Sequence, residues 1–177
     1  ISIKNICDLF AISEATARRD LEMLATQGRV RRVHGGATRI QQKAPPEMPF
    51  LQREVEQRDE KKRIGEAAAA LVNDGETVFL GSGSTVLEVA RNLRQLPDLT
   101  VITNSLPVMN ILADVHGISL VVVGGLLRHS ELSFIGHIAE QALAEVRADK
   151  VFLGTRAIDV IEGLSNHYLP ETLTDRA

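Results

Sequence analysis

The sequence predicts an α/β protein in which a small N-terminal winged helix-turn-helix unit precedes a larger, mostly parallel α/β domain. Two short stretches with helical spacing lie near the N-terminus, followed by a basic hairpin pattern. Three prolines then lie close together at positions 45, 46 and 49. Beyond them, short apolar strands alternate with amphipathic helices, which is typical of a parallel sheet with helices on both faces.

The composition limits the class of protein. Of the 177 residues 44% are hydrophobic, enough for a core, but only 3% are aromatic, so packing must depend on aliphatic side chains. The single cysteine, Cys7, cannot form an internal disulfide, which excludes a disulfide-rich secreted scaffold and fits the reducing cytoplasm. No apolar run approaches the roughly 20 residues that span a bilayer, so we expect no membrane partner.

The charge is distributed unevenly. Residues 1–40 hold seven lysines and arginines against four acidic residues, although the whole chain has a formal net charge of −3. A basic segment on an acidic protein suggests contact with a polyanion such as DNA. On charge alone, a chance distribution is the alternative.

The first 28 residues have the pattern of a helix-turn-helix. Ser2 can cap a helix over residues 3–10, and Ser13 can cap a second helix over residues 14–27 that stops at Gly28. Ile3, Ile6, Leu9 and Phe10 are expected to face inward from the first helix, and Cys7 is expected to be a small core residue.

The second helix has two distinct faces. At 100° per residue, Ala17, Leu21 and Leu24 form a buried stripe, whereas Thr16 and Arg19 project away from it. Arginine can bind guanine, and both residue types can bind phosphate, so this face is expected to enter a DNA groove. A solvated basic face on an ordinary helical hairpin is the alternative.

Residues 29–38 are predicted to form a β-wing beside that helix. Val30 and Val33 are apolar, Arg31 and Arg32 are basic, and Gly35-Gly36 is predicted to make the turn. Such arginines contact phosphates, and His34 could do so or could stabilise the turn. The candidate DNA-binding residues are Ser13, Thr16, Arg18, Arg19, Arg31, Arg32 and His34.

The predicted boundaries are a DNA-binding domain at residues 1–40, a linker at 41–57 and an α/β domain at 58–177. The charged stretch from Phe50 is expected to continue as one helix to Val72. The pattern then predicts strands at 77–80, 99–103, 118–123 and 150–153, and helices at 84–96, 106–113 and 138–146.

The loop Gly81-Ser82-Gly83-Ser84-Thr85 is the most informative part of the larger domain. It follows a predicted strand and opens a predicted helix, so glycine backbone, hydroxyl groups and a helix N-terminus could hold an anion. It matches neither common nucleotide-binding loop, and an ordinary turn is the alternative.

Other small polar loops end the remaining predicted strands, at the edge where open α/β sheets bind ligands. Lys61 could reach this edge from the preceding helix, and Asp159 could bind ligand hydroxyls or cap a turn. The candidate ligand-binding residues are Lys61, Gly81, Ser82, Gly83, Ser84, Thr85, Thr103, Asn104, Gly124, Gly154, Arg156 and Asp159. No catalytic residue, cofactor or metal site is predicted.

Two motifs together resemble the DeoR family of bacterial sugar-operon regulators. Ser13-Glu14-Ala15-Thr16-Ala17-Arg18-Arg19-Asp20-Leu21 is followed, at the expected separation, by Arg32-Val33-His34-Gly35-Gly36-Ala37. Ala17 departs from the usual Ile or Val. The chain also begins at what resembles the second helix of the family's reader and ends before the expected closing helix and strand, so both ends are expected to be incomplete.

The resemblance continues into the larger domain. Asp74-Gly75, the Gly81–Thr85 loop, Val101–Ser105, Gly124-Gly125 and Asp149–Gly154 are similar to the family's sensor domain, whose fold is similar to ribose-5-phosphate isomerase. It implies a cytoplasmic, nucleoid-associated repressor of a sugar-metabolism operon. Its partners would be operator DNA and a phosphorylated sugar, bound at Gly81–Thr85 with help from Lys61, and its assembly a homodimer or homotetramer.

Two alternatives remain. The first is a sugar-phosphate isomerase, which needs a carboxylate to move a proton between carbons. Arg156 stands where the related isomerases have an acid, and an arginine cannot serve as that base. We therefore expect binding without catalysis. The second alternative is a DNA-binding protein whose α/β domain only oligomerises.

Overall fold

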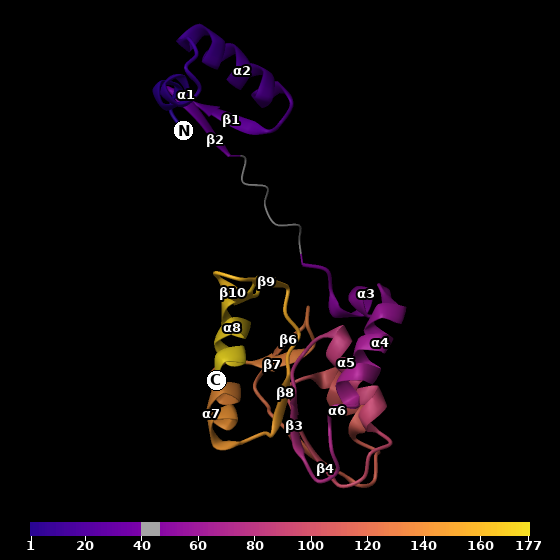
Figure 1. Cartoon of the computed structure of the whole chain (residues 1–177). Coiled ribbons are helices and arrows are strands. Elements are labelled where there is room, and N and C mark those ends of the chain that lie inside the picture. Colours follow the sequence, from indigo (N-terminus) through magenta and orange to yellow (C-terminus); the bar gives the residue numbers. More distant parts are fainter. Residues whose placement is uncertain (40–46) are drawn as a thin grey trace. The chain divides into compact units, whose positions relative to one another are not determined.

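The computed structural model describes residues 1–39 and 47–177, and these belong to two compact units (Figure 1). We call Ile1–Pro46 the head and Glu47–Ala177 the body. The predicted linker covers residues 41–57, of which 41–46 lie outside the described residues, as does residue 40. The remaining part of that range, from Glu47 onward, belongs to the body.

The head is a helix-turn-helix followed by a two-stranded wing. It consists of α1 (Ile3–Phe10), α2 (Glu14–Thr26), β1 (Val30–Val33) and β2 (Gly36–Arg39). Its core contains Ile3, Ala17, Leu21 and Ala37, with Cys7 packed against them as predicted.

Two details of the head differ from the sequence interpretation. The wing turn is His34-Gly35, because Gly36 already pairs with Val33 and its backbone lies so close to Ile1 that a side chain would not fit. Leu9 and Phe10 do not face inward and are 69% and 64% exposed. Leu9 lies about 120° from the buried face of α1, and Phe10 is its last residue.

The body is built on a four-stranded parallel sheet in the order β5-β4-β3-β8. These strands are β3 (Thr77–Leu80), β4 (Leu99–Thr103), β5 (Ile118–Val122) and β8 (Lys150–Phe152). Val78 pairs with Val101 on one side and with Lys150 on the other. The parallel α/β prediction is confirmed.

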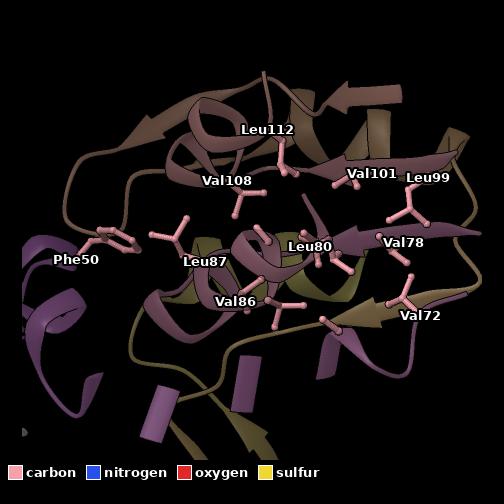
Figure 2. Packing of buried hydrophobic residues seen from close by; sticks show 14 residues of the cluster. Phe50, Val72, Val78, Leu80, Val86, Leu87, Leu99, Val101, Val108 and Leu112 are labelled. Carbon is pink, nitrogen blue, oxygen red and sulfur yellow. The ribbon is translucent and has the colours of Figure 1, made fainter. Parts of the chain in front are cut away.

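Helices cover both faces of this sheet (Figure 1). One face bears α4 (Arg58–Ala69), α5 (Ser84–Leu93) and α6 (Leu106–Leu112), and the other bears α7 (His137–Glu145). Alternation along β3 explains both cores: Val78 and Leu80 point into the larger core in Figure 2, whereas Phe79 packs toward α7.

The helix predicted from Phe50 to Val72 is in fact two helices. The first is α3 (Phe50–Val55), the second is α4, and the break falls at Glu56 and Gln57. Gln57 has a left-handed backbone with φ of 49°, which no continuous α-helix accommodates. Phe50 is 2% exposed in the larger core, so this part of the predicted linker is part of the folded body.

Five short elements were not predicted. They are β6 (Leu126–Arg128), β7 (Ser133–Ile135), β9 (Ala157–Asp159), β10 (Gly163–Ser165) and α8 (Leu169–Arg176). The strands form two antiparallel hairpins, β6 with β7 and β9 with β10, and α8 packs beside α7. Among the described residues, no helix combines the length and apolar character needed to cross a membrane, and no group of His, Cys, Asp or Glu could hold a metal ion.

Glu76 joins the entry of β3 to the edge strand β8. Its carboxylate accepts hydrogen bonds from the backbone N–H and side-chain amide of Asn73, both at 2.9 Å, and pairs with Lys150. The Asn73 N–H and the Lys150 ammonium lower the pKa of Glu76 to about 2.

We expect Glu76→Gln to lower the melting temperature at pH 7. Because the folded pKa lies below the ordinary value of 4.5, ionised Glu76 stabilises the fold above pH 4.5. That stabilisation is lost as the pH falls toward 2, so the difference between variant and wild type should close there. Melting curves from pH 7 to 2 measure this, with Glu66→Gln on the exposed face of α4 as the control. A difference that does not depend on pH would contradict it.

Candidate functional site

The second helix of the head, α2, is capped as predicted. The Ser13 hydroxyl accepts a hydrogen bond from the Thr16 N–H at 3.2 Å, and the two hydroxyl groups lie 2.9 Å apart. Ala17 and Leu21 are buried under the helix. Ser13 and Thr16 therefore lie at the N-terminal end of α2, where a helix can approach a phosphate.

The basic side chains of the head are exposed. Arg18 forms a solvent-facing ion pair with Glu14 at 3.2 Å, and Arg19 is exposed beside it. Arg32 donates a hydrogen bond to the backbone carbonyl of Arg18 at 3.1 Å, which connects the wing to α2. Arg31 and His34 are exposed on the wing. The arrangement offers positive charge on both α2 and the wing.

The main cavity of the body lies where the strand order reverses. After β3 the chain crosses to β4 on one side, whereas β8 pairs with β3 on the other side. This switch point is where open α/β sheets bind ligands. The cavity has a volume of about 440 Å³. Four of the predicted residues line it: Ser82, Thr85, Gly154 and Arg156.

The two loops of the cavity approach each other closely. A side chain at Gly154 would come within 2.9 Å of the Ser82 carbonyl oxygen, so this position requires glycine. Gly83 has φ of +124° and precedes α5, and no side chain among the described residues caps this helix N-terminus. Free N–H groups and the helix dipole at such an end favour an anion.

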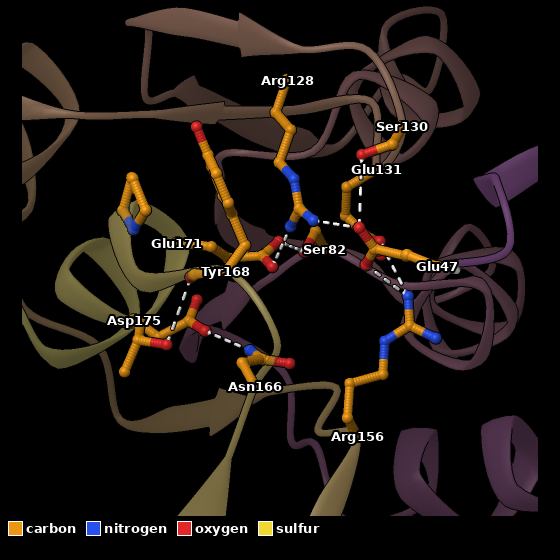
Figure 3. A network of polar contacts seen from close by, with 12 residues as sticks. Glu47, Ser82, Arg128, Ser130, Glu131, Arg156, Asn166, Tyr168, Glu171 and Asp175 are labelled. Carbon is orange, nitrogen blue, oxygen red and sulfur yellow. Dashed lines mark hydrogen bonds and ion pairs between the residues drawn. The ribbon is translucent and has the colours of Figure 1, made fainter. Parts of the chain in front are cut away.

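Six charged side chains form a network of ion pairs that we call the arginine–carboxylate cluster, and Figure 3 shows it around Arg128 and Arg156. Four of the six, Arg53, Glu131, Arg156 and Glu171, line the cavity. Arg128 pairs with both Glu47 and Glu171, and Arg53 pairs with Glu131. Arg156 lies 2.6 Å from Glu47 and 3.6 Å from Glu131. The members of the cluster are Glu47, Arg53, Arg128, Glu131, Arg156 and Glu171.

The cluster and its neighbours set the protonation of the carboxyl groups. Burial opposes ionisation of Glu47, but Arg128 and Arg156 outweigh it and lower the pKa of that carboxyl. Burial raises the pKa of Glu171 against the charge of Arg128. Ser82 donates to Glu171 at 3.3 Å, and the Tyr168 ring lies 4.5 Å from the Arg128 guanidinium. The charges of Arg128 and Arg156 thus favour the ionised form of Glu47.

Two further predicted residues serve the fold at this edge. The Gly81 N–H donates to the Phe152 carbonyl at 3.0 Å, and a side chain there would collide with Leu153, so Gly81 joins β3 to β8. Ser84 is 5% exposed in the first turn of α5. Neither Gly81 nor Ser84 lines the cavity, whereas Ser82 and Thr85 do.

Lys61 lies apart from the cavity lining. Its ammonium group donates to the backbone carbonyls of Arg53 and Glu56, the latter at 2.7 Å. Burial and the neighbouring Arg53 charge lower its pKa. In this structure Lys61 connects the end of α3 to α4.

Thr103 and Asn104 are buried at the end of β4. The Thr103 hydroxyl donates to the Leu80 carbonyl at 2.6 Å and accepts from the Ser105 N–H at 3.0 Å. Asn104 donates to the Phe134 carbonyl at 3.1 Å and borders a separate cavity of about 190 Å³ near α7. Both side chains join strand ends to neighbouring loops.

Gly124 and Asp159 also lie outside the cavity lining. Gly124 has open space around its Cα among the described residues. Asp159 caps the turn between β9 and β10, accepting from the N–H groups of Ile161 and Glu162 at 2.8 and 3.0 Å. Those two hydrogen bonds lower the pKa of Asp159. Of the two roles considered for Asp159, the structure thus shows the capping of a turn.

We expect Gly83→Ala to destabilise the body by about 1–3 kcal/mol, because its backbone conformation is accessible to glycine alone. The same strain should displace the start of α5 and weaken binding of anions at the cavity. Urea denaturation and calorimetric titration with a sugar phosphate measure the two effects. Gly124→Ala is the matched control and should change neither stability nor anion binding. Equal effects in both variants would contradict the role given to the backbone of Gly83.

The sequence interpretation missed five members of the cluster, all except Arg156. Glu47 and Arg53 fall in the predicted linker, and Arg128, Glu131 and Glu171 lie in or beside short elements that were not predicted. The Leu126–Arg128 and Ser133–Ile135 stretches around a four-residue connection are a hairpin signal that could have found β6 and β7. Nothing local indicates the ion pairs.

The fold and the cavity define a class of two-domain proteins, with a helix-turn-helix unit joined to an α/β domain that has a cavity at its switch point. The chain belongs to the DeoR family. Residues 1–43 match the DeoR-like helix-turn-helix domain, and residues 56–177 match the DeoR C terminal sensor domain.

Named relatives are transcriptional regulators. The chain is 38% identical over 94% of its length to the uncharacterized HTH-type transcriptional regulator YulB of Bacillus subtilis (strain 168), covering 64% of that protein. It is 39% identical over 89% of its length to the lactose phosphotransferase system repressor of Lactococcus lactis subsp. lactis, covering 63%. The chain thus spans less than two thirds of these relatives.

Among solved structures, ribose 5-phosphate isomerase A from Methanocaldococcus jannaschii matches 37% of this chain and 31% of its own. The identity is 28% and the TM-score 0.33.

Proposed function

We propose that this protein is a sequence-specific DNA-binding repressor of a sugar-metabolism operon, and that a phosphorylated sugar modulates its DNA affinity. The observation that carries the proposal is the cavity at the switch point, in a chain that also has a helix-turn-helix. Ser82, Thr85 and Arg156 offer hydroxyl and guanidinium donors there, next to the uncapped N-terminus of α5.

The family and its named relatives support the DNA-binding half of the proposal. A relative named as the lactose phosphotransferase system repressor also supports the sugar-operon half. The proposed contacts are Thr16, Arg18 and Arg19 on α2, with Arg31 and Arg32 on phosphates. Ser13 and His34 would contact phosphates at the ends of these elements.

The proposed mechanism is linkage between two binding sites. A sugar phosphate in the body would favour a conformation or assembly with weaker DNA affinity, and DNA would weaken sugar-phosphate binding by the same factor. Symmetric operators require at least a dimer, so we propose a homodimer or homotetramer in the cytoplasm, acting on the nucleoid. Light scattering of the purified protein tests the assembly.

The experiment that tests ligand binding is thermal stability against a panel of sugar phosphates, each paired with its unphosphorylated sugar. A ligand at about 100 times its dissociation constant adds about 2.7 kcal/mol to the free energy of unfolding. Stabilisation by phosphorylated members alone supports the proposal. No stabilisation by any member favours a body that only oligomerises, and turnover of a pentose phosphate would favour an isomerase.

We expect Arg19→Ala to weaken binding to a selected operator by about tenfold, because a lost base contact costs about 1–3 kcal/mol. It should also relax sequence preference. Arg31→Ala should weaken all sequences alike and reduce the salt slope by about one, as a phosphate contact does. Fluorescence anisotropy at several salt concentrations separates the two. Identical behaviour of both variants would contradict the separate roles.

A further inference from the structure

The arginine–carboxylate cluster is balanced in charge before any ligand arrives. Three guanidinium groups are paired with three carboxyl groups, so each arginine already has an acidic partner. Arg53, Glu131, Arg156 and Glu171 line the cavity, and Glu47 and Arg128 pair with lining residues. A phosphate group carries between one and two negative charges near neutral pH. An anion that enters this cavity therefore adds unpaired negative charge, unless a carboxylate leaves its arginine.

Glu47 is the carboxylate best placed to leave. It bridges Arg128 and Arg156, and its side chain is 18% exposed, against 6% for both Glu131 and Glu171. Glu171 belongs to α8, whereas Glu47 lies outside any helix or strand. Among the described residues, the other hydrogen bond to its side chain comes from the Ser130 hydroxyl, at 3.5 Å.

We propose that Glu47 holds the place of the effector's anion, and that a bound phosphate displaces its carboxylate from Arg156 and Arg128. The inference rests on the proposed function and adds the way in which the same site is regulated. Arg156 donates one hydrogen bond to the Glu47 carboxylate, at 2.6 Å. A guanidinium group can also bind a phosphate, even bidentately, so a phosphate can replace the carboxylate without a new donor.

Replacement of the Glu47 carboxylate by a phosphate would also affect the start of the body, because of the position of Glu47 in the chain. Glu47 is the first residue of the body, directly after the end of the head at Pro46. The next anchors are hydrogen bonds from Arg53 to the Met48 carbonyl at 3.0 Å and from the Phe50 N–H to the Ser130 carbonyl at 2.8 Å. Displacement would therefore release Glu47 at the start of the body, while Met48 and Phe50 stay anchored.

The test compares Glu47→Gln with the wild type in the full chain. The amide keeps the size of the side chain but removes its charge. We expect inorganic phosphate to bind the variant at least about tenfold more tightly, which corresponds to about 1.4 kcal/mol. Isothermal titration at constant ionic strength measures it, and the best sugar phosphate of the panel is titrated in parallel.

Glu54→Gln is the matched control. It also removes one negative charge and breaks one ion pair, that of Glu54 with Arg91 at 3.0 Å, but Arg91 is not a member of the arginine–carboxylate cluster. Its phosphate affinity should stay at the wild-type value. Glu47→Asp keeps the charge on a shorter side chain and should lie between wild type and Glu47→Gln. Circular dichroism will show whether the glutamine variant folds; if it does not, a gain in phosphate affinity of Glu47→Asp over the wild type tests the inference, and equal affinity would overturn it.

Three outcomes would overturn the inference alone: equal phosphate affinity in Glu47→Gln and wild type, weaker binding in Glu47→Gln, or an equal gain in Glu54→Gln. In each of them, binding of a sugar phosphate by the wild type leaves the proposed function standing. If neither the wild type nor Glu47→Gln binds any sugar phosphate or phosphate, the proposed function and this inference both fail.

Discussion

Replacing Arg156 with alanine should weaken the binding of a sugar phosphate by about 100-fold. Arg156 lies in the loop after β8 and lines the cavity. Ion pairs with Glu47 and Glu131 hold its guanidinium in place. A charge-assisted bidentate contact contributes about 1.5–3 kcal/mol, and 2.7 kcal/mol corresponds to a factor of about 100. Isothermal titration measures the loss.

Two controls define this result. Arg156→Lys keeps the charge but loses the fork geometry, so its affinity should lie between wild type and alanine. Arg94→Ala removes an arginine from a solvent-exposed ion pair with Asp114 at 3.5 Å and should leave binding unchanged. The folded state should survive Arg156→Ala, because Glu47 retains Arg128 as a partner. Wild-type affinity in Arg156→Ala would remove this residue from the site.

Replacing Leu80 with alanine should lower the free energy of unfolding by about 3–5 kcal/mol. Leu80 is fully buried at the end of β3, within the cluster of aliphatic side chains in Figure 2. Truncation removes apolar contacts and leaves a cavity that the parallel sheet and α5 cannot close. The body has few aromatic side chains to compensate, with 3% in the whole chain.

Urea denaturation measures the loss at Leu80. Leu51→Ala is the control, because Leu51 lies on the outer face of α3 and is 67% exposed, so its loss should stay within about 0.5 kcal/mol. Domains of this size have free energies of unfolding of about 5–15 kcal/mol, so the Leu80 variant should unfold at clearly lower urea concentration. A loss below 1 kcal/mol would show that the core relaxes around the gap.

The regular part of the body could be predicted because its signals are local. Val78–Leu80, Val101–Ile102 and the buried face of α5 are short apolar patterns bounded by Gly, Asn or Asp, and the structure confirms each of them. The break at Gln57 could not be predicted, since the charged stretch around it contains no glycine or proline. The three-residue strands β6, β7, β9 and β10 are too short to show the alternation of apolar and polar residues that identifies a strand.

Of the candidate site, the sequence predicted only the loops that follow the parallel strands at one edge of the sheet. Ser82 and Arg156 follow two parallel strands, so their meeting at one edge of the sheet follows from the topology. Their charged neighbours come from distant parts of the chain: Arg156 and Glu47 are 109 positions apart, and Arg128 and Glu171 are 43 apart. Pairing over such separations depends on tertiary packing, and the hydrophobic periodicity of the sequence gives no information about it.

The strand order also sets the sequence of events by which the chain folds. β3, β4 and β5 are consecutive neighbours, whereas β8 returns from far along the chain to pair beside β3, with Val78 opposite Lys150. Closing that long loop has the largest entropic cost, so β8 is expected to join last. Because the cavity lies between the ends of β3 and β8, a folding intermediate with three paired strands would have no effector site. Effector binding would then act only on molecules that have completed the last step of folding.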